Sequence, residues 1–265
     1  MDQIEFQCRV LNNQQLNPQT AILTLEAPQI AARAKPGQFV NISCNQFLRR
    51  PIGIMDADPE AGWIKCGIQI VGEGTRWLAG LKTEDQVSVL GPLGHGFDLD
   101  GIRRVITVGG GTGVFPLYFV QRYCQAKGIV GIAVCGYRSR TDSIITDEYN
   151  DAGCQTLFAS DCGDLPFHGN AGQALEHLLQ NITPVADTAI LTCGPKIMMK
   201  NVASIAAAYK LSCQVSLEER MACGVGVCLV CACATKSGDS GQGVNYQRCC
   251  AEGPVFPAEV IEWSI

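Results

Sequence analysis

The chain has little charge, few aromatic residues and no long apolar run. Charged residues make up 17% and aromatic residues 7% of its 265 residues, and the net charge is −5. A nucleic-acid partner is not expected, because such proteins carry an excess of Lys and Arg that this acidic chain lacks. No apolar run reaches the roughly 18 residues that span a bilayer, and the first residues lack a basic segment followed by an apolar one. We therefore expect no membrane segment, no signal peptide and a cytoplasmic protein.

Histidine is also scarce, and this excludes one class of chemistry. His95, His168 and His177 are scattered, and no His/Asp or Ser/His constellation for hydrolysis accompanies them. We therefore predict no catalytic side chain. Hydrophobic residues make up 47% of the chain, which is enough for a folded core.

Cysteine, by contrast, is abundant. The chain has 15 cysteines and no export signal, and the cytosol keeps thiols reduced, so metal or redox chemistry is favoured over a disulfide framework. Seven of the cysteines fall between Cys213 and Cys250. The scattered remainder are expected to behave as small buried hydrophobic residues.

Three segments differ in their patterning. Residues 1–101 show short alternating runs between Gly and Pro turns and one helical stretch, which is typical of a small barrel or sandwich. Residues 102–212 alternate apolar strands with helical stretches, which predicts a parallel sheet with crossover helices. Residues 213–265 form a cysteine-rich module with a β-like tail at 259–263. In the first segment strands are expected at 6–10, 20–25, 38–42, 63–71 and 86–90, and the helix at 75–81.

The cysteine module opens with a specific spacing. Cys223, Cys228 and Cys231 are separated by four and then two residues, and Cys249 and Cys250 follow further on. This is the plant-type 2Fe-2S pattern, in which one loop supplies three thiolates and a distant segment supplies the fourth. Neighbouring residues of an extended segment point to opposite sides, so only one of Cys249 and Cys250 can face the cluster.

Two other interpretations of these cysteines compete. A zinc ribbon needs a second pair of cysteines separated by two residues, and the chain offers an adjacent pair instead. Purely structural buried thiols are the second alternative. Seven cysteines within 213–250 are too dense for that interpretation.

A glycine turn in the middle segment indicates a nucleotide site. It follows an apolar strand and precedes a helical stretch, where glycines let a pyrophosphate approach a helix N-terminus. Val114 stands where the dinucleotide fingerprint has its third glycine, so an ordinary tight turn is the alternative. A second turn ends another apolar strand and should line the same edge of the sheet. The two turns consist of Gly109, Gly110, Gly111, Thr112 and Gly113, and of Cys193, Gly194 and Pro195.

Two features of the first segment suit phosphate groups. Arg49 and Arg50 precede an extended stretch stiffened by Pro51, so an arginine can pair with a phosphate while the backbone lies against a flat ring. Thr75 is a plausible N-cap of the helix, whose free N–H groups suit a second anion contact. Each feature alone is also typical of an ordinary surface.

Together these motifs resemble the ferredoxin–NADP reductase superfamily, and within it most closely the electron-transfer subunits of class 1B dihydroorotate dehydrogenases. The resemblance covers essentially the whole chain. Its most specific part is the string SLEERMAC at 216–223. The other strings are PGQFV at 36–40, RPIG at 50–53, LGPLG at 90–94, GGGTG at 109–113 and CAEGPVF at 250–256.

The resemblance implies an FAD-binding β-barrel domain at 1–101, an NAD-binding α/β domain at 102–212 and a 2Fe-2S cluster module at 213–265. By family alignment it makes Cys250 the fourth ligand beside Cys223, Cys228 and Cys231. Gly53 departs from the family's usual serine, Cys233 and Cys249 are extra thiols, and the loop between Cys231 and Cys250 carries a polar insert at 236–247. FAD contacts are implied for Arg50, Pro51, Ile52, Gly53, Gly67, Ile68, Gln69, Gly74 and Thr75.

The preferred nucleotide is open from the residues alone. Arg138 and Arg140 follow the strand expected at 130–135 and suit either a 2′-phosphate or the adenosine region of NAD. We favour NAD as the substrate.

The function implied is that of an oxidoreductase subunit. It passes electrons between NAD(H) and an FMN-containing dihydroorotate dehydrogenase catalytic subunit of pyrimidine biosynthesis, through FAD and the cluster, with two copies of each chain. Apolar side chains among the ligands predict an exposed patch for that partner, and packing against the barrel is the alternative. A related subunit serving another oxidoreductase or ferredoxin, and a non-catalytic redox sensor, are the rival functions. The apolar side chains are Val225, Val227, Leu229 and Val230.

Overall fold

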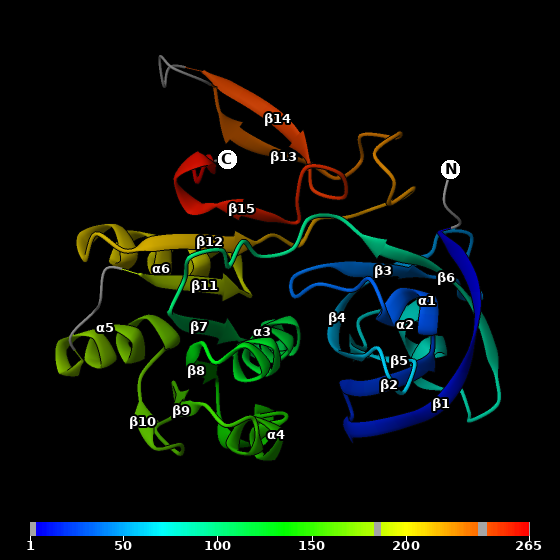
Figure 1. Ribbon diagram of the computed structural model, residues 1–265, viewed down its shortest axis with the longest axis horizontal. Helices are drawn as coiled ribbons and strands as arrows, with labels where there is room; N and C mark the ends of the chain where they lie inside the picture. Colours follow the sequence, from blue (N-terminus) through cyan, green and yellow to red (C-terminus); the bar gives the residue numbers. More distant parts are fainter. Residues whose placement is uncertain (1–3, 183–186, 238–242, 265) are drawn as a thin grey trace.

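A barrel and a sheet lie side by side in the computed structural model, which describes residues 4–182, 187–237 and 243–264. In Figure 1 the cysteine-rich segment lies above the junction between the two bodies. No helix among the described residues is both long enough and apolar enough to cross a membrane.

The barrel is built from strands of alternating burial. Within the described residues its strands close in the order β1-β2-β5-β4-β3-β6, and each pair of neighbours is antiparallel. Along β5 the buried Ile64, Cys66 and Ile68 alternate with more exposed residues, so one face fills the barrel. The barrel predicted from the short runs is confirmed. Its elements are β1 (Glu5–Asn17), β2 (Thr20–Glu26), α1 (Pro28–Ala31), β3 (Phe39–Ile42), β4 (Arg50–Asp58), β5 (Trp63–Gln69), α2 (Glu73–Ala79) and β6 (Gln86–Leu93).

The sheet is parallel except at one edge. Its strands within the described residues have the order β10-β9-β8-β7-β11-β12-β15, and β15 alone pairs antiparallel. The parallel sheet predicted from alternating strands and helices is confirmed. The strands are β7 (Arg104–Gly110), β8 (Val130–Tyr137), β9 (Gln155–Ser160), β10 (Phe167–His168), β11 (Thr188–Cys193), β12 (Ser212–Ser216) and β15 (Val255–Pro257).

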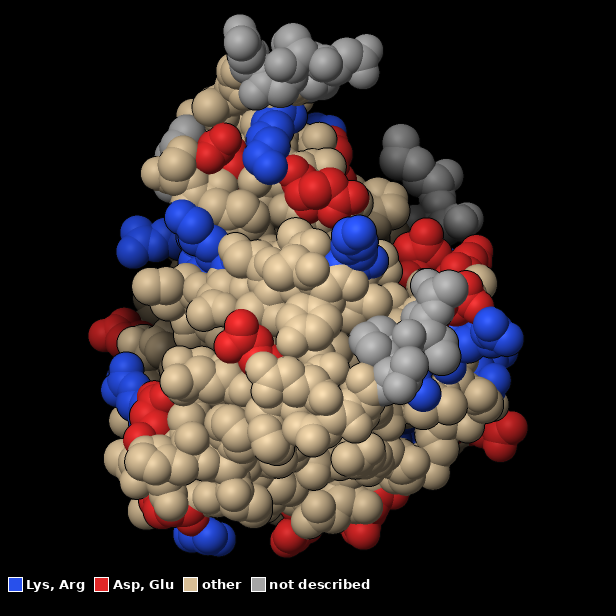
Figure 2. Space-filling view, turned by 90° about the vertical axis from the view of Figure 1, so that its left-hand side faces the viewer, with Lys and Arg blue, Asp and Glu red and all other residues tan. Residues whose placement is uncertain are grey.

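Helices cover both faces of this sheet, which explains why its strands are apolar throughout. On β7, Val105 joins the hydrophobic cluster of Leu117 from α3, whereas the next residue, Ile106, joins the cluster of Leu175 from α5. In Figure 2 the end of the molecule that carries α5 and α6 shows basic and acidic residues interspersed. The helical elements are η1 (Gly111–Gly113), α3 (Val114–Lys127), η2 (Arg140–Asp142), α4 (Thr146–Asp151), α5 (Ala171–Asn181) and α6 (Lys196–Ala208).

The order of the strands creates a switch point beside β7. The chain runs outward from β7 through β8, β9 and β10, and then returns to β11 on the other side of β7. In this register Gly109 pairs with Cys193, so the two predicted turns leave neighbouring strands at the same edge. Ligands bind at the carboxyl ends of strands at such a point.

The cysteine-rich segment extends this sheet through β15, which pairs with β12. A hairpin of β13 (Ala232–Lys236) and β14 (Val244–Arg248) occupies much of the polar insert at 236–247, and residues 238–242 lie outside the described part. The prediction of a β-like tail at 259–263 is wrong. Residues Ala258–Val260 form a 3-10 helix, η3, and Trp263 Nε1 donates to Ala258 O over 3.2 Å, which turns the chain back on itself.

Candidate functional site

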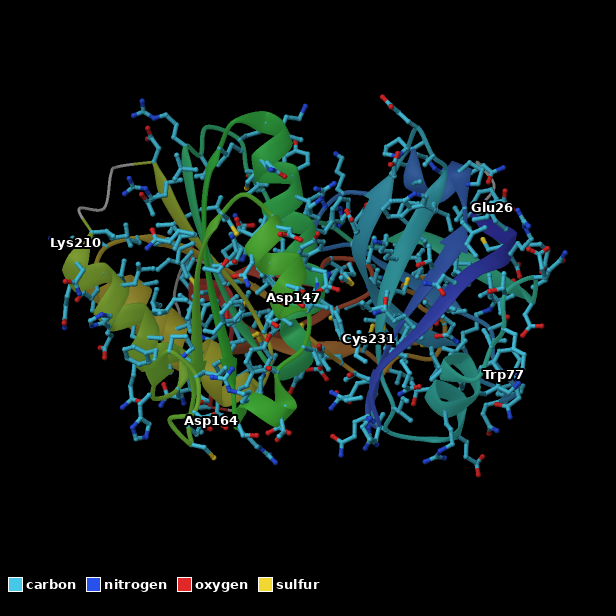
Figure 3. All side chains as sticks on the ribbon, turned by 90° about the horizontal axis from the view of Figure 1, so that it is seen from below. Glu26, Trp77, Asp147, Asp164, Lys210 and Cys231 are labelled. Atoms are coloured by element: carbon cyan, nitrogen blue, oxygen red, sulfur yellow. The ribbon has the colours of Figure 1, made fainter. Side chains whose placement is uncertain are left out.

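The four predicted cluster cysteines lie on two segments that meet. Three of them lie on the loop between β12 and β13, and Cys250 lies in the turn after β14. Gly226 N–H donates to Cys250 Sγ over 3.2 Å, and Cys250 N–H donates to Cys231 Sγ over 3.4 Å. In Figure 3 Cys231 lies over the junction between the barrel and the sheet. Thiols of both segments therefore share one neighbourhood.

Backbone N–H groups of the loop point at its own thiols as well. Val225 N–H and Val227 N–H each donate to Cys223 Sγ over 3.4 Å, and Cys223 N–H donates to Cys228 Sγ over 3.5 Å. Burial acts to raise the pKa of the Cys223 thiol, but hydrogen bonds from the backbone N–H groups of Val225, Cys228 and Val227 and from the Cys228 side chain outweigh it and lower the pKa to about 6. The thiolate is the form that binds metals, so the loop is prepared for that role.

Two glycines make this loop possible. Gly224 and Gly226 adopt φ values of 71° and 82°, a region that favours glycine. A Cβ at Gly224 would lie 2.7 Å from Asn41 Nδ2 of β3, and one at Gly226 would lie 3.0 Å from Ala251 Cβ. The loop is therefore folded tightly against both the barrel and the turn that carries Cys250.

The two extra thiols are engaged elsewhere. Cys249 is fully buried and its Sγ donates to Leu217 O over 3.3 Å, whereas Cys233 Sγ donates to Gln247 O over the same distance. Burial raises the pKa of both thiols, that of Cys233 to about 11. Both thiols thus donate to carbonyl oxygens, whereas thiols of the predicted ligands accept from backbone N–H groups of the loop and the turn.

The pairing of the four predicted thiols fits a two-iron cluster. Among the described residues, no three His, Cys, Asp or Glu side chains are placed to hold a single ion. The thiols form two pairs instead, Cys223 with Cys228 and Cys231 with Cys250. A 2Fe-2S cluster takes four cysteine thiolates, two on each iron.

A cavity of about 270 Å³ lies between the barrel, the edge of the sheet and the strand that leads to the cysteines. Gln69 and Thr112 meet across it, with Thr112 Oγ1 donating to Gln69 Oε1 over 3.2 Å. Gly67 lets the two bodies approach, because a Cβ there would lie 2.1 Å from Phe115 Cγ of α3. The predicted residues that line this cavity are Pro51, Ile52, Gly53, Gly67, Gln69, Thr75, Thr112 and Cys193.

Arg50 and helix α2 lie in contact beside this cavity. The Arg50 guanidinium stacks on Gly74, where a Cβ would lie 2.4 Å from its Nε, and Nη1 donates to Leu48 O over 2.7 Å. The prediction that Thr75 is the N-cap is wrong, because α2 begins at Glu73 with Gly72 as its N-cap. Thr75 lies in the first turn, and its hydroxyl accepts from Gly72 N–H over 3.1 Å. Gly72 has the extended backbone of an N-cap residue, and the threonine hydroxyl acts from the third helical position, where it binds the N-cap N–H.

A second cavity of about 160 Å³ adjoins the first at the edge of the sheet. Gly194 and Pro195 line it, and Leu217, Glu218 and Glu219 line both cavities. The two turns at this edge touch, since a Cβ at Gly113 would lie 2.2 Å from Cys193 O.

Several predicted residues line neither of these cavities. The Ile68 side chain is fully buried in the barrel core. Arg138 is exposed after β8, and the guanidinium of Arg140 is engaged with Asp164 O, at 2.9 Å from its Nε. The Arg140 amide also bonds the Asp164 carboxylate, which lowers the pKa of that carboxyl. The others are Arg50, Gly74, Gly109, Gly110, Gly111 and Gly113.

Reasoning from motifs missed the residues that line both cavities, Leu217, Glu218 and Glu219, which we call the shared wall. Glu218 lines both cavities. The residue is exposed, yet the protein atoms crowded around its carboxyl partly desolvate it, which raises its pKa. Burial, and then the nearby Glu218, raise the pKa of the Cys193 thiol. The string SLEERMAC at 216–223 includes the residues of the shared wall, but it was used only to support the family resemblance and not to assign cavity-lining residues. The missed lining residues of the first cavity include Phe115, Pro116, Ser216, Leu217, Glu218, Glu219 and Met221.

Comparison with known proteins agrees with this arrangement. The family model described as the iron-sulfur cluster binding domain of dihydroorotate dehydrogenase B matches residues 218–262. The dihydroorotate dehydrogenase B (NAD(+)) electron transfer subunit of Desulforamulus reducens is 36% identical and aligns with 97% of this chain and 98% of its own. The subunit of the same name from Enterococcus faecalis V583 is 35% identical over 95% of this chain and 96% of its own.

Solved structures show the same fold. The NADH-dependent reduced ferredoxin-NADP oxidoreductase, from a study of flavin-based electron bifurcation, has a TM-score of 0.86 at 27% identity, over 97% of this chain and 90% of that one. The ferredoxin reductase in carbazole 1,9a-dioxygenase has a TM-score of 0.66 at 19% identity, over 78% and 66% of the two chains, and shows the fold alone.

The barrel, the switch-point cavity and the module with the four cysteine thiols define an oxidoreductase of the ferredoxin–NADP reductase fold with an iron–sulfur module. Within that class, the chain belongs to the family of dihydroorotate dehydrogenase B (NAD(+)) electron transfer subunits.

Proposed function

We propose that this chain carries electrons between NAD(H) and the catalytic subunit of a dihydroorotate dehydrogenase, by way of FAD and a 2Fe-2S cluster. The observation that carries the proposal is a direct contact between the cavity and the cysteine module. Leu217 lines the cavity, and its carbonyl oxygen accepts a hydrogen bond from Cys249 Sγ over 3.3 Å. The residue that follows Cys249 is the predicted ligand Cys250. A flavin in this cavity and a cluster on the four thiols would therefore be neighbours.

The residue roles follow from this arrangement. We propose Cys223, Cys228, Cys231 and Cys250 as the cluster ligands. NAD would dock at the turn 109–113, at 193–195 and near Arg138, on the carboxyl edge where both turns meet. FAD would take the set Arg50, Pro51, Ile52, Gly53, Gly67, Ile68, Gln69, Gly74 and Thr75. The domain division at 101/102 and 212/213 belongs to the same proposal. The second boundary falls inside β12, after Ser212, and both β12 and β15 belong to the seven-stranded sheet.

FAD, when bound, supplies the conversion between a hydride pair and single electrons. The protein's own part is to bind, orient and shield. The Arg50 guanidinium lies against the first turn of α2 and offers charge to a phosphate group there. Gly67 lets the barrel pack closely against Phe115 of α3, and both residues line the cavity.

The partner surface is the apolar rim of the cluster loop. Val227 and Leu229 are 78% and 63% exposed, and Val225 and Val230 are also exposed, so packing against the barrel does not account for them. Such a patch beside a redox centre suits a protein partner. We propose that the partner is an FMN-containing dihydroorotate dehydrogenase subunit, that the complex holds two copies of each chain, and that it works in the cytoplasm.

The test compares the loaded chain alone with the complex. Alone, it should oxidise NADH with artificial acceptors and show no turnover of dihydroorotate. Adding the cognate catalytic subunit should create NAD-linked dihydroorotate oxidation. Dihydroorotate turnover by this chain alone, or no gain on adding the subunit, would refute the division of labour.

A second candidate is supported by the fold match at 27% identity to the NADH-dependent reduced ferredoxin-NADP oxidoreductase. In that case the chain would serve a ferredoxin-linked oxidoreductase. Isolation of the native complex decides between the two, because the partner would then be a ferredoxin-dependent flavoprotein and orotate would not be formed.

A further inference from the structure

Arg248 joins the two segments that carry the cluster cysteines. It lies at the end of β14, two residues before Cys250, and its Nη1 donates to Gly226 O over 2.6 Å. Its Nε lies 3.0 Å from both carboxylate oxygens of Glu252, and Nη2 bonds the same carboxylate. Glu252 is fixed further by the Arg248 backbone N–H, at 2.6 Å from Oε2.

The carbonyl that Arg248 holds belongs to a peptide that serves the cluster site. Gly226 O and Val227 N–H lie on the same peptide unit, and that N–H donates to Cys223 Sγ over 3.4 Å. The preceding N–H, of Gly226, donates to Cys250 Sγ over 3.2 Å. A charged donor on the carbonyl orients this peptide and polarises its N–H, because linked hydrogen bonds reinforce one another.

The pair is poorly suited to a purely structural role. The side chains of Arg248 and Glu252 are 38% and 36% exposed, and exposed ion pairs contribute little to stability. Reduction potentials of iron–sulfur clusters, however, respond to net charge and to hydrogen bonds on the sulfurs. Arg248 brings both to the site, a positive charge and a polarised donor, and Glu252 brings the opposing charge.

We propose that Arg248 is a positioning residue that raises the reduction potential of the cluster, through the Gly226–Val227 peptide and its own charge, and that Glu252 offsets that charge. The inference rests on the proposed function, since it requires a 2Fe-2S cluster on the four thiols.

The test is a redox titration of the FAD- and cluster-loaded chain, followed by the electron paramagnetic resonance signal of the reduced cluster. Arg248→Met should lower the midpoint potential, because the charge and the donor are both lost. Glu252→Gln should raise it, because the arginine charge is no longer offset. Each variant should change the ratio of reduced to oxidised cluster at the wild-type midpoint at least tenfold, which is about 59 mV for a one-electron couple. Arg248→Lys keeps the charge without the fork and should fall between wild type and Arg248→Met.

Arg103→Met is the matched control, because it removes an arginine from an exposed ion pair with Asp187 at the start of β7, and its midpoint should be unchanged. Shifts of the same sign in Arg248→Met and Glu252→Gln, no shift in either, or a lysine variant no higher than the methionine variant would overturn the proposal. If Arg248→Met binds no cluster, an upward shift in Glu252→Gln still supports it and any other result there overturns it. A wild-type chain without the cluster signal would overturn the proposed function as well, whereas a normal wild type with unshifted variants overturns this inference alone.

Discussion

The exchange of each adjacent cysteine for serine separates the cluster ligand from its neighbour. Cys249 is fully buried with its Sγ on Leu217 O, so Cys249→Ser places a hydroxyl where an acceptor is already present at 3.3 Å. We expect a loss of about 1 kcal/mol in the free energy of unfolding, because the new polar group keeps one partner. That corresponds to a fall of about 2–4 °C in Tm. Cys250→Ser removes a proposed iron ligand, and the binding free energy of the cluster with it.

Both variants are reconstituted anaerobically with iron and sulfide and compared with wild type by visible absorption, bound iron and thermal unfolding. Cys249→Ser should keep the 2Fe-2S spectrum and the iron content of wild type. Cys250→Ser should lose most of both. A Cys249→Ser chain without the spectrum beside a Cys250→Ser chain that retains it would refute the ligand assignment.

Three further predictions concern the cavity and the partner surface. Gly67→Ala should lower the free energy of unfolding in urea by about 1–3 kcal/mol and weaken FAD retention, because its Cβ would lie 2.1 Å from Phe115 Cγ. Gly53→Ala is the control for the unfolding measurement, since its Cβ meets Pro116 at 3.5 Å, and equal losses of unfolding free energy in the two variants would contradict the argument. The pKa of Glu218 is raised in the folded chain, so ionisation of this carboxyl destabilises the fold as pH rises past the ordinary carboxyl range. The free energy of unfolding of Glu218→Gln relative to wild type should therefore increase from pH 4 to pH 7 in urea titrations of the cofactor-free chain. A decrease over this range would exclude the raised pKa of Glu218 as a source of pH dependence. Val227→Glu should abolish co-elution with the catalytic subunit while NADH oxidation with artificial acceptors continues. Val130→Glu, at an exposed position on β8, is the control and should leave the complex intact. Co-elution of the Val227 variant with the catalytic subunit would show that this patch is not part of the interface.

The hydrophobic pattern of the sequence predicted the strands that are buried along most of their length, and it failed for strands that are largely exposed. The runs at 20–25 and 188–192 are buried on most positions, and the structure has β2 and β11 there. The hairpin of β13 and β14 escaped notice because β14 is exposed or half-buried along its length, so its sequence reads as a polar loop. The tail at 259–263 is mainly apolar and suggests a strand, yet the buried Ile261 pairs only through an isolated bridge to Thr235. Alternation records burial, and a strand also needs a partner.

The motif residues of the candidate site could be predicted from the sequence, but several residues that line its cavities could not. The spacing of Cys223, Cys228 and Cys231 carries its geometry within one loop, so the pattern could be interpreted directly. Glu218 becomes part of the cavity only because β12 pairs with β11 and leads the chain back past the barrel. The orientation of Cys249 toward Leu217 likewise depends on a contact between residues 32 positions apart. No local pattern contains such information.

The shared wall at 217–219 explains why the motifs of this chain belong together. A two-electron donor must meet the flavin at the edge of the sheet, and both cavities open at that edge on the same three residues. A one-electron acceptor must lie close to the flavin, and Leu217 in that wall is bonded to the residue beside Cys250. The loop that carries three of the thiols exposes Val227 and Leu229. Under the proposed function, the donor edge, the cavity, the thiols and this apolar rim are therefore the stations of one electron route between NAD(H) and a partner subunit.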